Sequence, residues 1–323
     1  MLKKNKMLNC CVIGGTGFIG IHVVKELLSN HRKVTVIGRN PVPSRKLPTG
    51  VTYVSGDCCN KDFLLKVLFN MDEIINLAYS TVPKTSFEDP INDIFANLPL
   101  CINLFEVAID MKINKLVIIS SGGTVYGKAI ELPITENHPT NPISPYGITK
   151  LATEKYAMMY KELKGLPVVC VRPSNAFGVG QMPFLGQGFI PTAVASILKQ
   201  KAITLFGDTG TVRDYIHVSD IAKGIVAALK YGAIGSFYNI GSGIGKSNRE
   251  LLEILNHFAR NAGLNLNVKI LPNRRFDVPA NILNCNKIKS ETGWEPTVSL
   301  QEGLEQVWNW FSNKKNLSES NKG

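Results

Sequence analysis

The chain has 323 residues, of which 44% are hydrophobic, and a mean hydropathy of +0.04, which is ordinary for a globular protein with a large core. No apolar run approaches the length needed to cross a bilayer, so we expect no membrane association. The net charge of +11 invites a nucleic-acid hypothesis, but the basic residues are spread along the chain and no basic run is interleaved with aromatic residues. We therefore expect no nucleic-acid partner. An anionic small-molecule substrate explains the charge at least as well.

The seven cysteines include two adjacent pairs, Cys10-Cys11 and Cys58-Cys59, and no C-x-x-C spacing. An odd number without ligand spacing indicates reduced thiols, with neither a disulfide framework nor a metal site. The basic start of the chain is followed almost at once by glycines, which does not predict a signal peptide. We expect a cytoplasmic protein.

Residues 8–13 form a short apolar run typical of a buried strand, and 22–28 have helical spacing. Between them lie Gly14, Gly17 and Gly20, spaced G-x-x-G-x-x-G instead of the usual G-x-G-x-x-G. A strand, a glycine turn and a helix in this order predict dinucleotide binding, because the turn lets the pyrophosphate approach the backbone at a helix N-terminus. The alternative is a purely structural turn.

A second strand, 34–37, ends at Gly38 and Arg39. A carboxylate at this position would accept the ribose hydroxyls of NAD, whereas an arginine can bind the 2′-phosphate of NADP. Because no carboxylate is present, NADP stays possible beside NAD. Arg39 can equally stack on adenine.

Further strands are expected at 51–54, 74–78, 116–119 and 167–171, with helices between them. Strands that alternate with helices predict an α/β fold with a doubly wound parallel sheet of the Rossmann type. We expect a dinucleotide-binding domain over 1–175 and a smaller α/β substrate lobe over 176–312, with some of its segments returning to the first domain. Residues 313–323 read as a polar, flexible tail.

Ser144 and Pro145 are suited to the N-cap and the first position of a helix. Tyr146 and Lys150 then lie on one helix face, four residues apart. An ammonium about 4 Å from a phenol, at an effective dielectric near 20, favours the phenolate by roughly 4 kcal/mol, an upper bound of about three pKa units. The pair is thus a candidate acid–base device, although a lone Tyr-x-x-x-Lys is more often ordinary helix surface.

Several motifs in order, over nearly the whole chain, resemble the extended short-chain dehydrogenase/reductases of the NAD-dependent epimerase/dehydratase type. They are the glycine run 14–20, the segment 120–127, Tyr146 with Lys150, 172–178 and 213–218. Within that family they are similar to the UDP-galactose 4-epimerases and their nucleotide-sugar relatives. The resemblance implies a cofactor site and a nucleotide-sugar site that meet at Tyr146, the general base.

The residues that the resemblance and the strand ends assign to the cofactor are Gly14, Thr16, Gly17, Phe18, Ile19, Arg39, Asp57, Cys58, Leu77, Ala78, Tyr79, Asn97, Ser120, Tyr146 and Lys150. Those assigned to the substrate are Thr81, Ser121, Thr124, Asn175, Phe206, Arg213, Arg274 and Asn281. The guanidinium groups among them suit a diphosphate. Without the motifs, the same arginines would be read as surface residues.

The chain departs from the epimerases at Gly122, where they usually carry the serine or threonine that hydrogen-bonds the reacting hydroxyl. Thr124 is our candidate replacement, and Ser121 is the other hydroxyl nearby. The Asp-Glu pair of the related dehydratases is absent, since Gly123 and Thr124 stand there. Asn281 replaces a tyrosine that limits bulk at the sugar C2, which leaves N-acetylhexosamines open.

Three functions follow. The first is a 4-epimerase for a UDP-hexose or UDP-N-acetylhexosamine, acting through a transient 4-keto sugar with the nicotinamide cofactor bound. The second is an NADPH-dependent NDP-4-keto-6-deoxysugar reductase, and the third a cofactor-sensing regulator without chemistry. By the same resemblance we expect a homodimer formed through the helices near 90–111 and 145–164.

Overall fold

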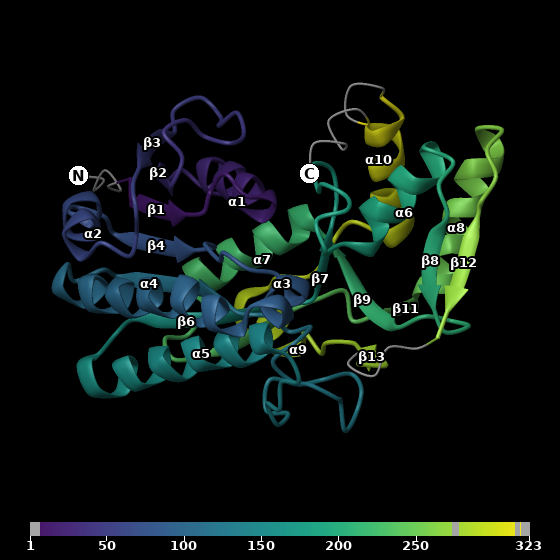
Figure 1. Cartoon of the computed structure of the whole chain (residues 1–323). Helices are drawn as coiled ribbons and strands as arrows, with labels where there is room; N and C mark the ends of the chain where they lie inside the picture. The colour runs from purple at the N-terminus through teal and green to yellow at the C-terminus, as the bar shows by residue number, and fades with distance from the viewer. Residues whose placement is uncertain (1–6, 273–277, 314–316, 318–323) are drawn as a thin grey trace.

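The computed structural model describes residues 7–272, 278–313 and 317. Its centre is a sheet in which seven strands run parallel in the order β10-β6-β5-β4-β1-β2-β3 (Figure 1). The strand order reverses beside β1, which is the doubly wound Rossmann arrangement predicted from the sequence. The strands are β1 (Asn9–Ile13), β2 (Lys33–Gly38), β3 (Thr52–Ser55), β4 (Glu73–Asn76), β5 (Lys115–Ile119), β6 (Val168–Pro173) and β10 (Phe237–Ile240).

Helices cover both faces of this sheet, as its buried apolar strands require. On one face α4 (Pro90–Asp110) and α5 (Pro145–Lys164) lie side by side, and α2 (Lys61–Leu68) and α3 (Pro83–Glu88) pack against α4. On the other face α1 (Phe18–Ser29) packs against α7 (Val218–Tyr231). Each face has its own apolar cluster, around Leu104 and Phe105 on the first side and around Val23, Leu27 and Ile225 on the second.

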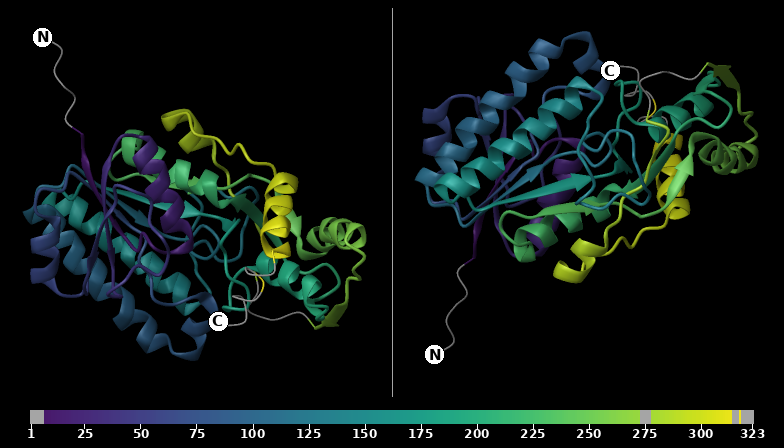
Figure 2. Two further views of the ribbon diagram at one scale, coloured as in Figure 1. Left: turned by 90° about the horizontal axis from the view of Figure 1, so that it is seen from above. Right: turned by 90° about the horizontal axis from the view of Figure 1, so that it is seen from below.

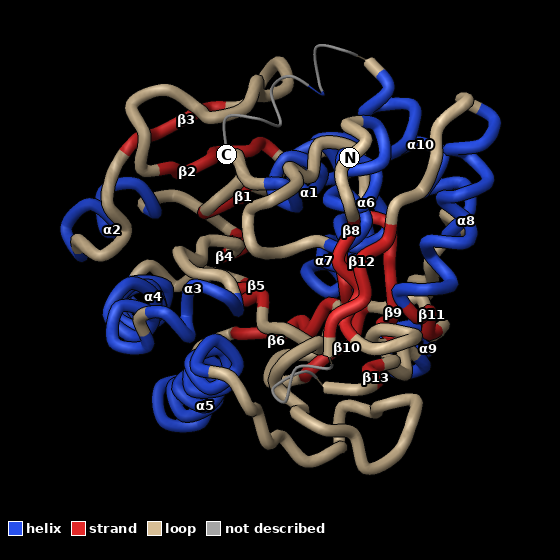
Figure 3. Tube along the Cα trace, turned by 45° about the vertical axis from the view of Figure 1, so that its right-hand side comes forward, coloured by secondary structure: helices blue, strands red, loops and turns tan. Residues whose placement is uncertain are grey.

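The second lobe lies beyond the carboxyl ends of the strands (Figure 2). Its helices are α6 (Phe189–Leu198), α8 (Asn248–Asn261) and α10 (Leu300–Ser312), which share an apolar cluster with Phe177 and Tyr215. The short helix α9 (Asn286–Thr292) packs against α7. The lobe's small sheets contain β7 (Asn175–Phe177), β8 (Ile203–Phe206), β9 (Val212–His217), β11 (Gly245–Ser247), β12 (Val268–Leu271) and β13 (Ala280–Asn281). Figure 3 labels five of them, β8, β9, β11, β12 and β13.

Two segments from beyond residue 175 pack with the main sheet. The strand β10 pairs with β6 at the edge of the sheet, and α7 covers the same face as α1. The chain beyond residue 175 therefore contributes to both parts of the structure. The segment 313–323 lies largely outside the described residues.

The helix α5 begins as its sequence predicts. The Ser144 hydroxyl accepts a hydrogen bond from the Gly147 N–H at 3.1 Å, and Pro145 occupies the first turn. Further along, Glu154 forms a buried bidentate ion pair with Arg172 of β6, at 2.6 and 2.8 Å. The ion pair thus fixes the helix that carries Tyr146 and Lys150 to the sheet.

Of the helices within the described ranges, only α4 is long and apolar enough by length and composition to cross a membrane. Its inner face packs against the sheet and α5, and it buries the polar side chains of Asp93 and Asn97, which is the behaviour of a core helix. All seven cysteines are free thiols, and no cluster of metal-ligating side chains occurs in the described part of the chain.

Candidate active site

The glycine turn between β1 and α1 forms a close backbone cradle. Gly14 has φ +79°, and a Cβ there would lie 2.9 Å from the backbone nitrogen of Ala78. A Cβ at Gly20 would lie 2.4 Å from the Gly14 carbonyl oxygen, so helix and strand approach as closely as glycine allows. Gly17 caps α1 without a side-chain hydrogen bond. The helix N-terminus therefore presents its backbone N–H groups to an anion, which fits the pyrophosphate of a dinucleotide.

The catalytic pair predicted on α5 lies directly across from this turn. The Lys150 Nζ donates to the carbonyl oxygen of Ile119, at the end of β5, over 2.8 Å. It also stands 3.8 Å from the centroid of the Tyr79 ring and 5.7 Å from that of Tyr146. Tyr79 and Tyr146 pack edge to face with centroids 4.9 Å apart. Three side chains from two elements thus form one packed group.

The electrostatics of this group differ from the expectation based on spacing alone. Burial, followed by the Asp93 carboxylate, raises the pKa of Tyr146 well above its usual value. Burial also lowers the pKa of Lys150, to about 8. The expected fall in the Tyr146 pKa is not found in this structure, because burial and the Asp93 carboxylate both disfavour the phenolate.

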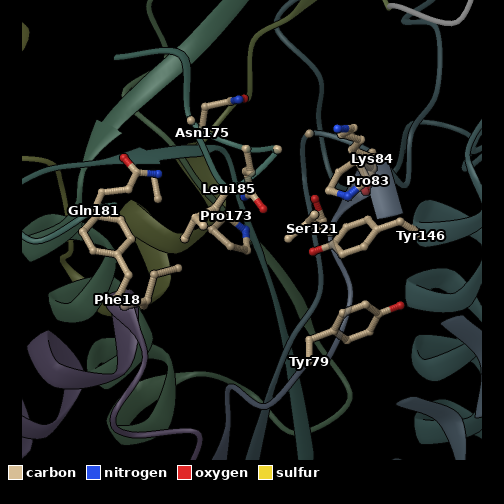
Figure 4. A pocket seen from close by; sticks show the side chains of 18 of the residues that line it. Phe18, Tyr79, Pro83, Lys84, Ser121, Tyr146, Pro173, Asn175, Gln181 and Leu185 are labelled. Atoms are coloured by element: carbon tan, nitrogen blue, oxygen red, sulfur yellow. The ribbon is translucent and has the colours of Figure 1, made fainter. Parts of the chain in front are cut away.

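A cavity of about 1030 Å³ joins the glycine turn, the Tyr146–Lys150 pair and the second lobe. Figure 4 shows Ser121 beside Tyr146 on one side of this cavity, with Gln181 on the opposite side. Its volume suits a ligand of more than one moiety. The predicted site residues that line it are Gly14, Gly17, Phe18, Ile19, Leu77, Tyr79, Ser120, Ser121, Thr124, Tyr146, Lys150, Asn175 and Arg213.

Other predicted residues have their polar groups in internal contacts. The Thr81 hydroxyl donates to the buried Asp93 carboxylate, and Asn97 bonds the Ser80 N–H at 2.8 Å and Thr81 Oγ1 at 3.2 Å. Asn281 is fully buried and donates to the Gly122 carbonyl oxygen at 3.0 Å. Through these hydrogen bonds the side chains hold the loops that surround the cavity, without lining it themselves. The predicted residues outside the cavity lining are Thr16, Arg39, Asp57, Cys58, Ala78, Thr81, Asn97, Phe206 and Asn281.

Arg274 lies outside the described residues. Asp57 accepts a hydrogen bond from the Cys59 N–H at 2.9 Å, a local turn contact at the end of β3. The cavity nevertheless lies at the carboxyl ends of the parallel strands, where this topology predicts a ligand site.

Comparison with known proteins agrees with this geometry. The model of the NAD dependent epimerase/dehydratase family matches residues 10–241. The chain belongs to this family. It is 32% identical to the UDP-glucose 4-epimerase of Halalkalibacterium halodurans, over 93% of this chain and 94% of that protein.

Two crystal structures of family members are also similar to it. The UDP-glucose 4-epimerase of Thermotoga maritima, solved with UDP-glucose, has a TM-score of 0.88 and 30% identity, covering 95% of this chain and 100% of that one. The UDP-glucose 4-epimerase of Thermus thermophilus, a complex with NAD, has a TM-score of 0.86 and 32% identity, covering 95% and 99%.

Gly122, the departure from the epimerases of this family, has a packing cause. A Cβ at Gly122 would lie 2.5 Å from Leu283 Cδ1 and 2.9 Å from the Arg172 carbonyl oxygen. The backbone at Gly122 is held by hydrogen bonds to Pro173 and Asn281, so the loop cannot easily retreat. Thr124 Oγ1 is buried near the cavity with no hydrogen-bond partner among the described residues. Ser121 is the second hydroxyl-bearing residue on this loop that lines the cavity.

Gly38 has a similar explanation, which bears on the choice of NAD or NADP. A Cβ at Gly38 would lie 2.6 Å from the Tyr53 hydroxyl oxygen, and that hydroxyl is itself fixed by a 2.6 Å bond to the Asn40 carbonyl. Packing against Tyr53 is thus sufficient reason for the missing side chain. Arg39 is exposed and does not line the cavity.

Sequence reasoning missed several cavity residues. The Arg45 guanidinium spans from the loop after β2 to the Gly180 carbonyl oxygen of the second lobe, at 2.8 Å. Gln181 is 8% exposed and lines the cavity, with its Oε1 unbonded within the described chain. Neither lies in a periodic segment or a recognised motif. The one signal in the sequence is the glycine-rich composition of 178–188, which includes Gln181.

The packing at Gly122 generates a prediction. We expect Gly122→Ser to lower the free energy of unfolding by about 1–3 kcal/mol, because its Cβ enters occupied space. The matched control is Gly123→Ser, where the nearest atom to a Cβ, Asn175 Oδ1, is 3.6 Å away. Urea denaturation of both variants measures the difference. Equal stability of the two would contradict the packing account.

Proposed function

We propose that the protein is a nucleotide-sugar 4-epimerase that acts on a UDP-hexose or UDP-N-acetylhexosamine with NAD bound. The observation that carries the proposal is the convergence of the glycine cradle, the Tyr146–Lys150 pair, and Asn175 with Arg213 on one cavity. Relatives of similar length that are named UDP-glucose 4-epimerases support it. A cytoplasmic location belongs to the same proposal and rests on the free thiols.

The residues divide the chemistry between them. The N-terminus of α1 would hold the pyrophosphate of NAD, and Lys150 would hold its nicotinamide ribose. Tyr146 takes the proton of the sugar 4-hydroxyl and later returns it. When bound, NAD would accept the hydride from the sugar C4 and return it to the other face of the same carbon, so no net oxidation would occur.

The substrate's diphosphate belongs near Asn175 and Arg213, on the side of the cavity formed by the second lobe. A guanidinium can donate two parallel hydrogen bonds to a phosphate, which suits Arg213 to this role. Asn281 acts on the sugar pocket only indirectly in our proposal, through its bond to Gly122. We propose the division into a dinucleotide domain and a substrate lobe on the same grounds.

The reductase gains nothing from these observations. The residues in favour of the reductase are Gly38 with Arg39, and Gly122. Both glycines are explained by packing against Tyr53 and Leu283, and Arg39 does not line the cavity. The regulator without chemistry is disfavoured because the Tyr146–Lys150 pair lines the cavity.

Conversion of UDP-glucose to UDP-galactose tests the function. We expect purified protein to carry NAD and to interconvert the two sugars, or their N-acetyl counterparts, without added cofactor. Tyr146→Phe should lower kcat by roughly 10²–10⁴-fold, because it removes the base, and should keep NAD bound. Tyr156→Phe, an exposed tyrosine on the same helix, is the control. Dependence on stoichiometric NADPH would refute the epimerase.

The hydroxyl that assists Tyr146 can be identified by two variants. We expect Thr124→Val, which keeps the volume, to lower kcat by about 10²-fold with little change in KM, because the hydrogen bond is needed as charge develops on the sugar oxygen. Ser121→Ala should have a smaller effect. Steady-state kinetics of the two variants measure the fall in kcat of each. A larger fall for Ser121→Ala would assign the role to Ser121.

We also propose a homodimer formed through α4 and α5. Their outer faces expose large apolar side chains, including Phe95 at 70% and Leu163 at 73%. Exposed apolar side chains along two neighbouring helices mark an association surface. We expect light scattering to give twice the chain mass of 35.4 kDa, and Phe95→Glu with Leu163→Glu to give monomer. Val42→Glu, on an exposed loop, should remain dimeric; a monomeric wild type would refute the dimer.

A further inference from the structure

The ammonium group of Lys150 is buried, which disfavours its charged form. Its side chain is 7% exposed, and in the described part of the chain no carboxylate forms an ion pair with it. Its one hydrogen bond is to the neutral carbonyl of Ile119. A buried ammonium with a single neutral acceptor is costly, so another group must stabilise the charge.

Charged and titratable groups face Lys150 from α4, α5 and the loop after β4. Cys101 and Asp93 lie on α4, Glu154 lies on α5 with Tyr146, and Tyr79 lies on the loop. Burial raises the pKa of the Cys101 thiol to about 11, so it is neutral near pH 7.

The two carboxylates act at longer range and are already engaged. Glu154 is paired with Arg172, and Asp93 accepts the Thr81 hydroxyl. The group in direct contact with the ammonium is the face of the Tyr79 ring, at 3.8 Å. This distance is well within the range of a cation–π interaction, which strengthens when the cation is desolvated.

The ring is also held rigidly in place. The next residue, Ser80, donates its N–H to Asn97 Oδ1, and the Thr81 hydroxyl donates to Asp93. Since Asn97 and Asp93 both lie on α4, these two hydrogen bonds hold the loop against that helix. The ring also packs edge to face against Tyr146. A ring fixed in this way can define the position of the ammonium as well as its charge.

We propose that Tyr79 is a positioning residue whose π face keeps the Lys150 ammonium charged and oriented for its work with Tyr146. This rests on the proposed function. Because a cation–π contact favours the charged form, its loss lowers the pKa at which Lys150 gives up its proton. As the pH rises, the activity that depends on the ammonium is then lost at a lower pH than in the wild type.

The proposal can be tested by reducing the negative potential of the ring face in steps, with little change in the shape of the ring. Tyr79→Phe keeps the π face, and its pH profile of kcat/KM is the reference for the fluorinated variants. Replacing that Phe by tri- and then pentafluorophenylalanine removes the negative potential of the face. We expect the alkaline limb to move to lower pH stepwise, by roughly one unit in total. The limb staying in place across the series would overturn the proposal.

A second measurement is independent of turnover. NAD binding, followed by fluorescence quenching, should be nearly equal for Tyr79→Phe and its pentafluoro form at pH 6.5, where the ammonium is charged in both. At pH 8.5 the pentafluoro form should bind several-fold more weakly. Equal affinity at both pH values counts against the proposal. If Tyr146→Phe leaves epimerisation intact, the proposed function fails instead.

Discussion

The buried ion pair between Arg172 and Glu154 is the contact on which the site depends most. Their side chains are 4% and 1% exposed, and the two bonds join α5, which carries Tyr146 and Lys150, to β6, which leads to Asn175. Burying two charges gains little net stability, since desolvation offsets the attraction. We infer that the pair serves geometry: it fixes the helix at one register along the sheet.

The same pair organises the neighbouring loop. Arg172 also donates to the Tyr126 hydroxyl at 3.0 Å, and that hydroxyl donates to Asn239 Oδ1 at 2.7 Å. Tyr126 lies in the segment 120–127 that carries Ser121 and Thr124, and Asn239 lies on β10. A chain of buried hydrogen bonds therefore links this segment to the edge strand of the sheet. Such networks define one arrangement because each unsatisfied member would be costly.

Much of the fold could be predicted from local sequence. The strands expected at 34–37, 51–54, 116–119 and 167–171 are present as β2, β3, β5 and β6 with bounds shifted by at most two residues, since short apolar runs encode them locally. The short elements α3, β11 and β13 were not predicted. They are too short for any period to show, and contacts with distant segments stabilise them.

For the site, the sequence determined the glycine turn, the start of α5 at Ser144 and the presence of Tyr146 and Lys150 on one helix face, because these depend on neighbours within a few residues. Only the tertiary structure decided what surrounds them. It placed Tyr79 beneath Lys150, turned Asn97 and Asn281 inward, and brought Leu283 against Gly122. Those contacts join residues far apart in the chain, and the pKa of Lys150 is set by the burial they create, which no local pattern records.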